Sequence, residues 1–173
     1  MRLGRSGPSL GALALLVVLV AVLVSGGEDP ERTVGVDPEG DEVTATVTRV
    51  VDGDTVAVEI DGSEDSVRYI GVDTPESVAP GEPVECFGPE ASRFNARLVE
   101  GEEIRLVFDA ERRDRYGRLL AYVYAGDVFV NAELIRRGFA TTLTIPPNDS
   151  FADRFERLAD RASEAGRGLW GAC

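Results

Sequence analysis

Histidine and lysine are absent from this chain of 173 residues, and cysteine occurs only as Cys86 and Cys173. Without histidine, two cysteines are too few to hold zinc, which takes about four nitrogen or sulfur ligands. All 18 basic residues are therefore arginines, against 31 acidic residues, and the formal net charge is −13. This balance argues against a broad basic surface that binds nucleic acid non-specifically. It also suggests the hydrated acidic surface of a protein adapted to high salt, a hypothesis that thermal unfolding across a NaCl series tests.

Residues 1–27 differ from the rest of the chain. Arg2 and Arg5 precede an unbroken apolar run over residues 10–24, with no acidic residue among them. The run is shorter than the roughly 20 residues that a bilayer-spanning helix needs. A positive start, a short apolar stretch and the small residues 25–27 predict a secretory signal peptide, with an uncleaved N-terminal anchor as the alternative. Both interpretations predict a secreted or extracellular protein, in the second case with a membrane tether.

Residues 28–42 are rich in glycine, proline and acidic side chains, and they predict a flexible, solvated linker. The folded domain is then expected over residues 43–173, which is long enough for a single core. In an exported protein Cys86 and Cys173 can form a disulfide, and closing so long a loop stabilises a fold by roughly 3–5 kcal/mol. A pair of free thiols is the alternative.

Hydrophobic periodicity predicts a mainly β fold with helices, of the α+β class. Strands are expected over residues 43–51, 55–60, 67–72, 103–108 and 119–124, with turn signals between them. Helices are expected from Pro89 to Gly101, from a cap at Asn131 to Gly138, and from a cap at Asn148, Asp149 or Ser150 to Gly166. Five short strands with a helix between the third and fourth predict an OB-type barrel with about three helices.

The first polar cluster is Asp52-Gly53-Asp54-Thr55, between the first two expected strands. Asp-Gly between strands is an ordinary hairpin turn, and the spacing of an EF-hand loop is missing. Paired carboxylates in such a turn also suit a hard cation such as Ca²⁺ or Mg²⁺. The turn therefore has both a structural and a functional interpretation.

The second cluster is "SVRYIGVDTPES", residues 66–77. Strand alternation places Arg68 on the face of Ile70 and Val72, where a guanidinium needs an anionic partner. One interpretation is a structural ion pair with Asp73 or Glu76. The other is an arginine aimed at a phosphate beside oxygen ligands for a cation.

The third cluster is "RRDRYGR", residues 112–118, the densest positive segment of an acidic chain. It is either a solvated hairpin turn or a group that grips phosphate and stacks on a base. Together the three clusters contain acidic metal ligands, a further carboxylate as base, and arginines for a phosphate. These are the parts needed for phosphodiester hydrolysis.

The chain resembles the staphylococcal nuclease (thermonuclease) family from about Val47 to Trp170. The resemblance is carried by "DGDT", "VRYIGVDTPES", "CFGPEAS", "DRYGRLLAYVY" and "VNAELIRRGFA", in the order and spacing of the family. It implies an OB-fold barrel with helices, and Ca²⁺-dependent hydrolysis of DNA and RNA by attack of water on phosphorus. The protein is expected to be a monomer with a nucleic acid substrate.

By motif position, the resemblance implies that Asp54, Asp73 and the backbone carbonyl of Thr74 hold Ca²⁺. Glu76 is the implied general base for the attacking water. Asp52 is expected close to the metal without ligating it directly.

The resemblance further implies that Arg68 and Arg118 bind the phosphate and stabilise the charge that develops on it. Tyr116 falls where the family contacts the nucleotide, and Arg115 takes the place of a lysine often found beside it. A catalytically inactive nucleic-acid-binding module is the alternative. Such modules usually lose the carboxylates and arginines that this chain retains.

One segment departs from the family pattern. Where a Tyr-x-Tyr pair is expected after the short helix, this chain reads "TTLTIPPND", with Leu143 and Ile145 in those places. Those tyrosines shape the pocket for base and sugar, so the departure bears on base preference and affinity and leaves the reaction itself unaffected.

Overall fold

A computed structural model describes residues 40–77 and 83–173. The predicted signal peptide or anchor lies outside these residues, as does the linker up to residue 39. Asp41 and Glu42, which the prediction assigns to the linker, take part in the barrel. The N–H of Phe108 donates a hydrogen bond to the carbonyl of Asp41 at 3.0 Å, and the first strand begins at Glu42. No helix in the described part of the chain is long and apolar enough to cross a bilayer.

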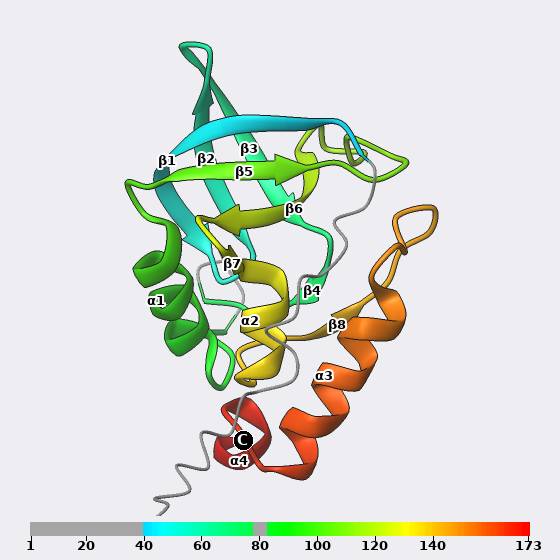
Figure 1. The fold of residues 1–173 in the computed structure, drawn as a ribbon. Coiled ribbons are helices and arrows are strands. Elements are labelled where there is room, and N and C mark those ends of the chain that lie inside the picture. The colour runs from blue at the N-terminus through cyan, green and yellow to red at the C-terminus, as the bar shows by residue number, and fades with distance from the viewer. Residues whose placement is uncertain (1–39, 78–82) are drawn as a thin grey trace, which may run out of the picture. The chain divides into compact units, whose positions relative to one another are not determined.

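Five strands close into a barrel (Figure 1). They are β1 (Glu42–Asp52), β2 (Thr55–Ile60), β3 (Ser63–Tyr69), β5 (Glu103–Val107) and β6 (Leu119–Ala125). The strand order is β3-β2-β1-β5-β6, and the parallel pairing of β3 with β6 closes the ring. All the other pairs are antiparallel, and the short β7 (Val128–Phe129) extends the β6 edge. The predicted five-stranded OB-type barrel is confirmed.

The predicted third strand, residues 67–72, is in fact broken in two. β3 ends at Tyr69, and β4 (Gly71–Asp73) pairs with β8 (Thr141–Leu143) in a separate two-stranded ladder. Gly71 makes the break: its φ is +78°, and a Cβ there would lie 2.5 Å from the Phe155 ring. The strand alternation therefore stops before Ile70. The prediction that Arg68 shares a buried face with Ile70 and Val72 is wrong. Within β3, the side chains of Val67 and Tyr69 are buried, and the side chain of Arg68 is on the other face of the strand.

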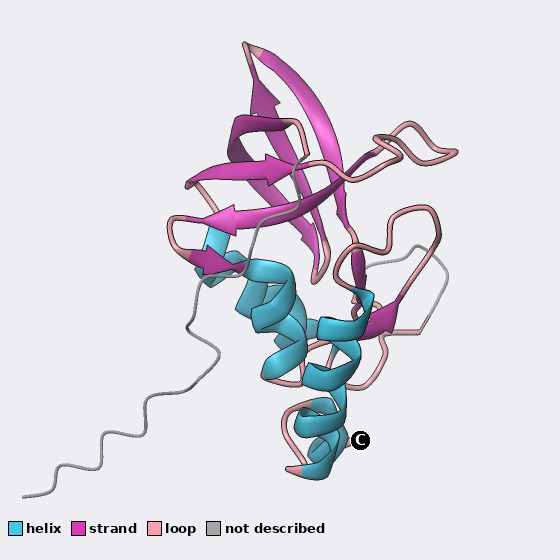
Figure 2. Ribbon diagram, turned by 45° about the vertical axis from the view of Figure 1, so that its right-hand side comes forward, coloured by secondary structure: helices cyan, strands magenta, loops and turns pink. Residues whose placement is uncertain are grey.

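The helices lie together at one end of the barrel (Figures 1 and 2). They are α1 (Gly88–Val99), α2 (Val130–Arg136), α3 (Ala152–Glu164) and the four-residue α4 (Leu169–Ala172). The three longer helices were predicted, and proline stands at the start of α1 as expected. Helix α3 buries an apolar stripe that consists of Phe155, Leu158 and Ala162.

The predicted helix caps are wrong. Helix α2 begins at Val130, and the buried Asn131 instead accepts a hydrogen bond from the Val123 N–H and donates one to the Ile70 carbonyl. Helix α3 has no side-chain cap, and Asn148 exchanges hydrogen bonds with both backbone groups of Glu111. In both places the amide side chain binds backbone groups of another segment, and at Asn131 these groups are buried, which outweighs local capping.

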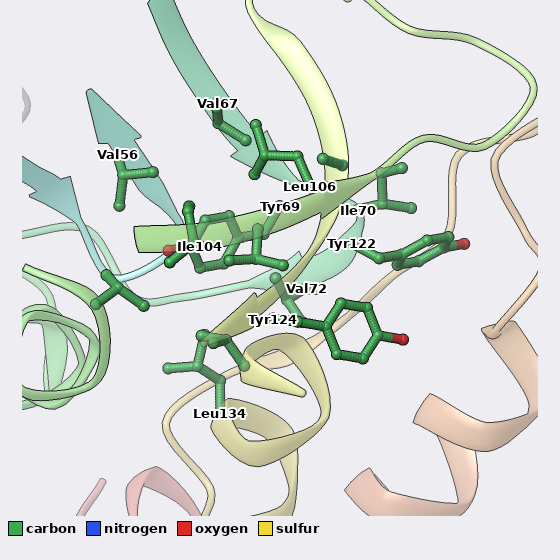
Figure 3. Close-up of a cluster of buried hydrophobic side chains, with 14 of the residues drawn as sticks. Val56, Val67, Tyr69, Ile70, Val72, Ile104, Leu106, Tyr122, Tyr124 and Leu134 are labelled. Atoms are coloured by element: carbon green, nitrogen blue, oxygen red, sulfur yellow. The ribbon is translucent and has the colours of Figure 1, made fainter. Parts of the chain in front are cut away.

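Apolar side chains from the strands and from α2 fill the space inside the barrel and below it (Figure 3). They include Val56, Val67, Tyr69, Ile104, Leu106, Tyr122, Tyr124 and Leu134. Each large side chain buried in this way contributes roughly 1.5–3 kcal/mol. The Tyr69 hydroxyl donates to Asn95 of α1, and the Asn95 amide donates to the carbonyl of Asp52. The core thus holds the β1–β2 turn in place.

The two cysteines form a disulfide, with Cα atoms 6.0 Å apart. It joins the residue two before α1 to the C-terminal residue, and closes a loop with a sequence separation of 87. This confirms the predicted pairing and decides against free thiols.

Candidate active site

Asp54 is a buried carboxylate at the start of β2, with 5% of its surface exposed. Its Oδ2 accepts hydrogen bonds from the N–H of Thr74 at 2.9 Å and from its hydroxyl at 3.1 Å. Its Oδ1 accepts from the Thr55 hydroxyl at 3.0 Å. A Cβ at Gly53 would lie 2.6 Å from the Thr74 hydroxyl oxygen, so only glycine fits there. The hairpin turn is therefore docked against the end of β4, as well as joining two strands.

Arg68 is fixed in the same network. Thr55 pairs with Arg68 in the β2–β3 ladder, which brings the guanidinium alongside Asp54. Its Nη2 lies 3.2 Å from Asp54 Oδ2 and 3.0 Å from Asp73 Oδ1. Its Nη1 donates to the Val72 carbonyl at 2.7 Å and to the Tyr69 carbonyl at 3.1 Å. The side chain is only 15% exposed, and these bonds leave it little freedom to change rotamer.

Burial raises the pKa of Asp73 above its ordinary value, and the negative charges of Asp54 and Glu85 add to the effect, although Arg68 opposes it. Burial likewise raises the pKa of Asp52, and the charges of Asp54 and Glu76 act in the same direction. Hydrogen bonds from Ser77 and Gly53 partly offset that shift. Several carboxylates therefore repel one another here, which is the condition that a bound cation relieves.

Glu76 lies at the edge of this acidic group. Its carboxylate accepts a hydrogen bond from the Ser77 N–H at 2.9 Å, and the Ser77 hydroxyl donates to Asp52 Oδ1 at 2.6 Å. The main chain of Glu76 is bound by Glu85, through the N–H of Glu76 and the Oε2 of Glu85. The short segment after β4 therefore places Glu76 beside Asp52, next to the Asp54–Arg68 network.

Arg118 belongs to a second group, in the turn before β6. Asp114 organises this turn: its Oδ1 accepts from the N–H groups of Tyr116 and Arg118, and its Oδ2 accepts from Arg118 Nε at 2.7 Å. The ring of Tyr116 is 69% exposed and lies near two guanidinium carbons, 4.8 Å from that of Arg115 and 5.6 Å from that of Arg118. The turn presents an aromatic face between two cations.

Barrel closure brings the two groups onto neighbouring strands. Val67 of β3 pairs with Leu119 of β6, so Arg118 enters β6 directly beside the strand that carries Arg68. A groove of about 590 Å³ adjoins the turn, and its lining includes Arg49, Glu64, Asp65, Tyr116 and Arg118 but not the residues of the Asp54–Arg68 network. The structure thus joins Asp54, Arg68, Asp73 and Thr74 in one network, with Asp52 and Glu76 at its edge. It gathers Arg115, Tyr116 and Arg118 in the adjoining turn.

The donor atoms of the network fit a hard cation in type. In the described ranges, 40–77 and 83–173, no three or more histidine, cysteine or carboxylate side chains form a ready-made metal site. Asp54 and Asp73 nevertheless share one cationic group, the Arg68 Nη2. Ca²⁺ takes about six to eight oxygen ligands, some of them water. Both carboxylates and the carbonyl of Thr74 suit that requirement, with water and substrate supplying the rest.

Several polar residues that the sequence motifs do not single out hold this site together. Ser77 binds Asp52, Asn95 ties α1 to the same turn, Glu85 binds the Glu76 main chain, and Asp114 holds Arg118. Asn95 could have been suspected, because it follows Phe94 on the buried side of a helix. Glu85 and Ser77 carry no local signal, since their partners lie 9 and 25 residues away.

A family model described as "Staphylococcal nuclease homologue" matches residues 66–172. The chain belongs to the staphylococcal nuclease family. It is 37% identical to the thermonuclease of Staphylococcus intermedius over 158 residues, which cover 91% of this chain and 93% of that protein. It is also 37% identical to the thermonuclease of Staphylococcus hyicus over 157 residues, with 91% of each chain covered. Endonuclease YncB of Bacillus subtilis (strain 168) is 39% identical over 130 residues, 74% of this chain and 62% of that protein.

The family assignment confirms the resemblance inferred from the five motifs. The segment matched by the staphylococcal nuclease model includes Arg68, Asp73, Glu76 and Arg118, and it begins after the turn that holds Asp54. The roles of the individual residues stay predictions.

Proposed function

We propose that this member of the staphylococcal nuclease family is a calcium-dependent nuclease that hydrolyses phosphodiester bonds of DNA and RNA. The observation that carries the proposal is the position of Arg68, whose Nη2 lies within 3.2 Å of both Asp54 and Asp73. A fixed guanidinium beside converging carboxylates offers a place for a phosphate and for a cation side by side. We further propose that the enzyme acts as a monomer outside the cytoplasm, secreted or tethered by its N-terminal segment.

Asp54, Asp73 and the carbonyl of Thr74 would hold the calcium ion. When bound, it supplies positive charge beside the scissile phosphate, in a region where burial, and to a smaller extent neighbouring carboxylates, already raise the pKa of Asp73. The three hydrogen bonds that Asp54 accepts from Thr55 and Thr74 keep this ligand in place before any ion arrives.

The two arginines divide the binding of the phosphate. Arg68 is held by two main-chain carbonyls and by the carboxylates of Asp54 and Asp73, so its guanidinium is fixed in place beside the proposed position of the phosphate. Arg118, in the turn before β6, is tied to Asp114 and can exchange that carboxylate for a phosphate oxygen. Charge-assisted hydrogen bonds to a developing oxyanion are worth roughly 3–4 kcal/mol each in comparable enzymes.

Glu76 acts as the general base in this proposal. A water attacks phosphorus, and its proton passes to the Glu76 carboxylate as the new P–O bond forms and the bond to the leaving oxygen breaks. The Ser77 N–H, 2.9 Å from Glu76 Oε1, keeps the carboxylate oriented.

Tyr116 and Arg115 contact the nucleotide beyond the phosphate. The exposed ring can stack on a base, an interaction worth roughly 1–3 kcal/mol. Leu143 and Ile145, which are 40% and 62% exposed, occupy the places of the family's tyrosines. We expect an apolar contact with base or sugar there, and weaker base preference, since neither side chain donates a hydrogen bond.

Assays of the cleavage of single-stranded DNA and RNA, with added Ca²⁺ or with a chelator, test the proposal. They are repeated across a salt series, because salt screens the repulsion between the acidic protein and nucleic acid. We expect Ca²⁺-dependent cleavage by the wild-type protein. The Glu76→Gln variant should lose most of its kcat while it still binds a nucleotide and Ca²⁺. Near-normal turnover in that variant would remove Glu76 from its role. Binding of nucleic acid with no cleavage at any salt concentration would favour a binding module.

A further inference from the structure

The main chain of Glu76 is held by residues that come well after it in sequence. Its N–H donates to Glu85 Oε2 at 2.9 Å, and its carbonyl accepts from the Glu85 N–H at 2.9 Å. Gly88 packs against the same carbonyl, because a Cβ at Gly88 would lie 2.4 Å from the Glu76 oxygen and 3.0 Å from the Pro75 oxygen. Glu85 and Gly88 therefore fix the peptide groups on both sides of Glu76.

Glu85 and the two residues that follow it are attached to three parts of the fold. Its carbonyl accepts a hydrogen bond from the Gly88 N–H at 3.1 Å, at the start of α1. The next residue, Cys86, is bonded to Cys173. The residue after that, Phe87, stacks on Phe139 with ring centroids 5.3 Å apart. Residues 85–88 are thus tied to α1, to the segment after α2 and to the C-terminus.

The C-terminal end of this connection is also fixed. Leu169, the first residue of α4, donates its N–H to the Gly138 carbonyl at 2.8 Å. Arg167 Nη1 donates to the Arg136 carbonyl at 3.1 Å. A Cβ at Gly168 would lie 2.2 Å from the Gly138 oxygen, so the two backbones are in close contact. Cys173 therefore ends a docked helix, and through the disulfide it anchors the segment that holds Glu76.

We infer that Glu85 is a positioning residue for Glu76, and that the Cys86–Cys173 disulfide, by anchoring Glu85, makes the C-terminal helix part of the catalytic geometry. The inference rests on the proposed function of Glu76 as general base. A base must lie within hydrogen-bond reach of the water it deprotonates. A misplacement of about 1 Å can lower a rate by roughly 100-fold, so a clamp on the main chain of the base acts on kcat.

The Glu85→Ala variant removes the acceptor for the Glu76 N–H. We expect kcat to fall by roughly 5–20-fold, which is part of the loss that a 1 Å misplacement produces. The substrate KM should stay close to wild type, and any change in the Ca²⁺ concentration for half-maximal activity should be the same in Glu85→Ala and Glu85→Gln, because both remove the charge that acts on Asp73. Glu85→Gln keeps a carbonyl oxygen in the same place and should recover most of the kcat. The matched control is Glu100→Ala, which removes an exposed charge at the other end of α1.

The disulfide is tested with Cys86→Ser/Cys173→Ser, assayed well below its unfolding temperature. We expect a fall in kcat of the same order as in Glu85→Ala. Adding Glu85→Ala to this variant should lower kcat by much less than it does in the wild type, because residues that act through one connection are not additive. Hydrogen exchange of the Glu76 amide supplies a readout besides activity, and exchange should be faster in Glu85→Ala and in the double serine variant.

Wild-type kcat and wild-type amide exchange in Glu85→Ala would overturn the inference and leave the nuclease proposal standing. An equal loss of kcat in Glu85→Gln and Glu85→Ala would also overturn it, because Glu85 would then act through its charge. Full additivity of Glu85→Ala with the serine variant would remove the disulfide from the connection. If Glu76→Gln kept its turnover, the proposed role of Glu76 would fail, and the inference about catalysis with it.

Discussion

Arg68 and Arg118 are expected to bind the same phosphate, but the protein holds them in very different ways. The guanidinium of Arg68 contacts the carboxylates of Asp54 and Asp73 and two main-chain carbonyls, and its side chain is 15% exposed. The guanidinium of Arg118 pairs with Asp114 in a turn, and its side chain is 34% exposed. Arg68 lies in a barrel strand, whereas Arg118 lies in an exposed turn, where a substrate can replace its partner Asp114.

This difference separates two contributions to catalysis. Groups that need no rearrangement when charge develops on the substrate stabilise a transition state most effectively. Arg68 comes closer to that condition, because two main-chain carbonyls fix its guanidinium, although its Nη2 is shared with Asp54 and Asp73. Arg118 must leave a carboxylate to reach a phosphate, so part of its binding energy is offset by the loss of the Asp114 pair.

The largest effect is expected from Arg68→Ala. The variant should lose roughly 3–4 kcal/mol of transition-state stabilisation, measured as kcat/KM. It should also lose roughly 3 kcal/mol or more of unfolding free energy in urea, because Asp54 is left buried without its cationic partner. Arg68→Lys is the control. It keeps the charge but cannot make the same set of planar hydrogen bonds, so stability should recover more than activity. A stable Arg68→Ala protein would show that Thr55 and Thr74 alone satisfy Asp54.

Arg118→Ala should separate activity from stability. We expect a loss of roughly 2–3 kcal/mol in kcat/KM, somewhat below that of Arg68→Ala. The unfolding free energy should change by less than about 1 kcal/mol, since a partly exposed ion pair contributes little. Urea unfolding and steady-state kinetics on one preparation measure both quantities. A loss of unfolding free energy equal to that of Arg68→Ala would contradict the proposed difference between the buried arginine of the strand and the exposed arginine of the turn.

The smallest effect is expected from Asp114→Asn, which keeps one acceptor oxygen for the backbone N–H groups of the turn but replaces Oδ2, the partner of Arg118 Nε, with an amide NH2 and removes the charge. Partial burial opposes ionisation of Asp114, but hydrogen bonds from Arg118 and from two backbone N–H groups outweigh it, so the pKa is lowered from its usual 3.8. Because the pKa of Asp114 is lower in the folded state than in the unfolded state, its ionised form stabilises the fold at pH values above the ordinary pKa. That stabilisation is lost as the pH falls through the lowered pKa.

The wild-type protein should therefore be more stable than Asp114→Asn by at most about 1 kcal/mol near neutral pH. The two proteins should become equal well below pH 3.8, and thermal unfolding as a function of pH measures this. The KM for substrate should change by only a few-fold. A difference in stability that persisted at the lowest pH would mean that the amide disturbs the turn itself.

The sequence predicted the barrel and most of the site because both depend on local patterns. Alternating β-branched residues mark the strands, and short motifs mark Asp54, Arg68 and Arg118. The break at Ile70 was not predictable from alternation, because it depends on the Phe155 ring packing against Gly71 from a helix late in the chain. The true role of Asn131 depends in the same way on Val123 and Ile70. Contacts that form only after the chain has folded are invisible to periodicity.

The parallel pairing of β3 with β6 also determines when the enzyme can act. This pairing brings the turn that carries Arg118 beside the strand that carries Arg68. The hydrogen bond between Asp54 and Thr74 likewise joins residues 20 positions apart in the sequence. An unfolded chain therefore carries every catalytic side chain but no assembled centre. If the N-terminal segment directs export of an unfolded chain, the nucleic acids of the producing cell are spared during synthesis. In that proposal, barrel closure is the step that assembles the active centre.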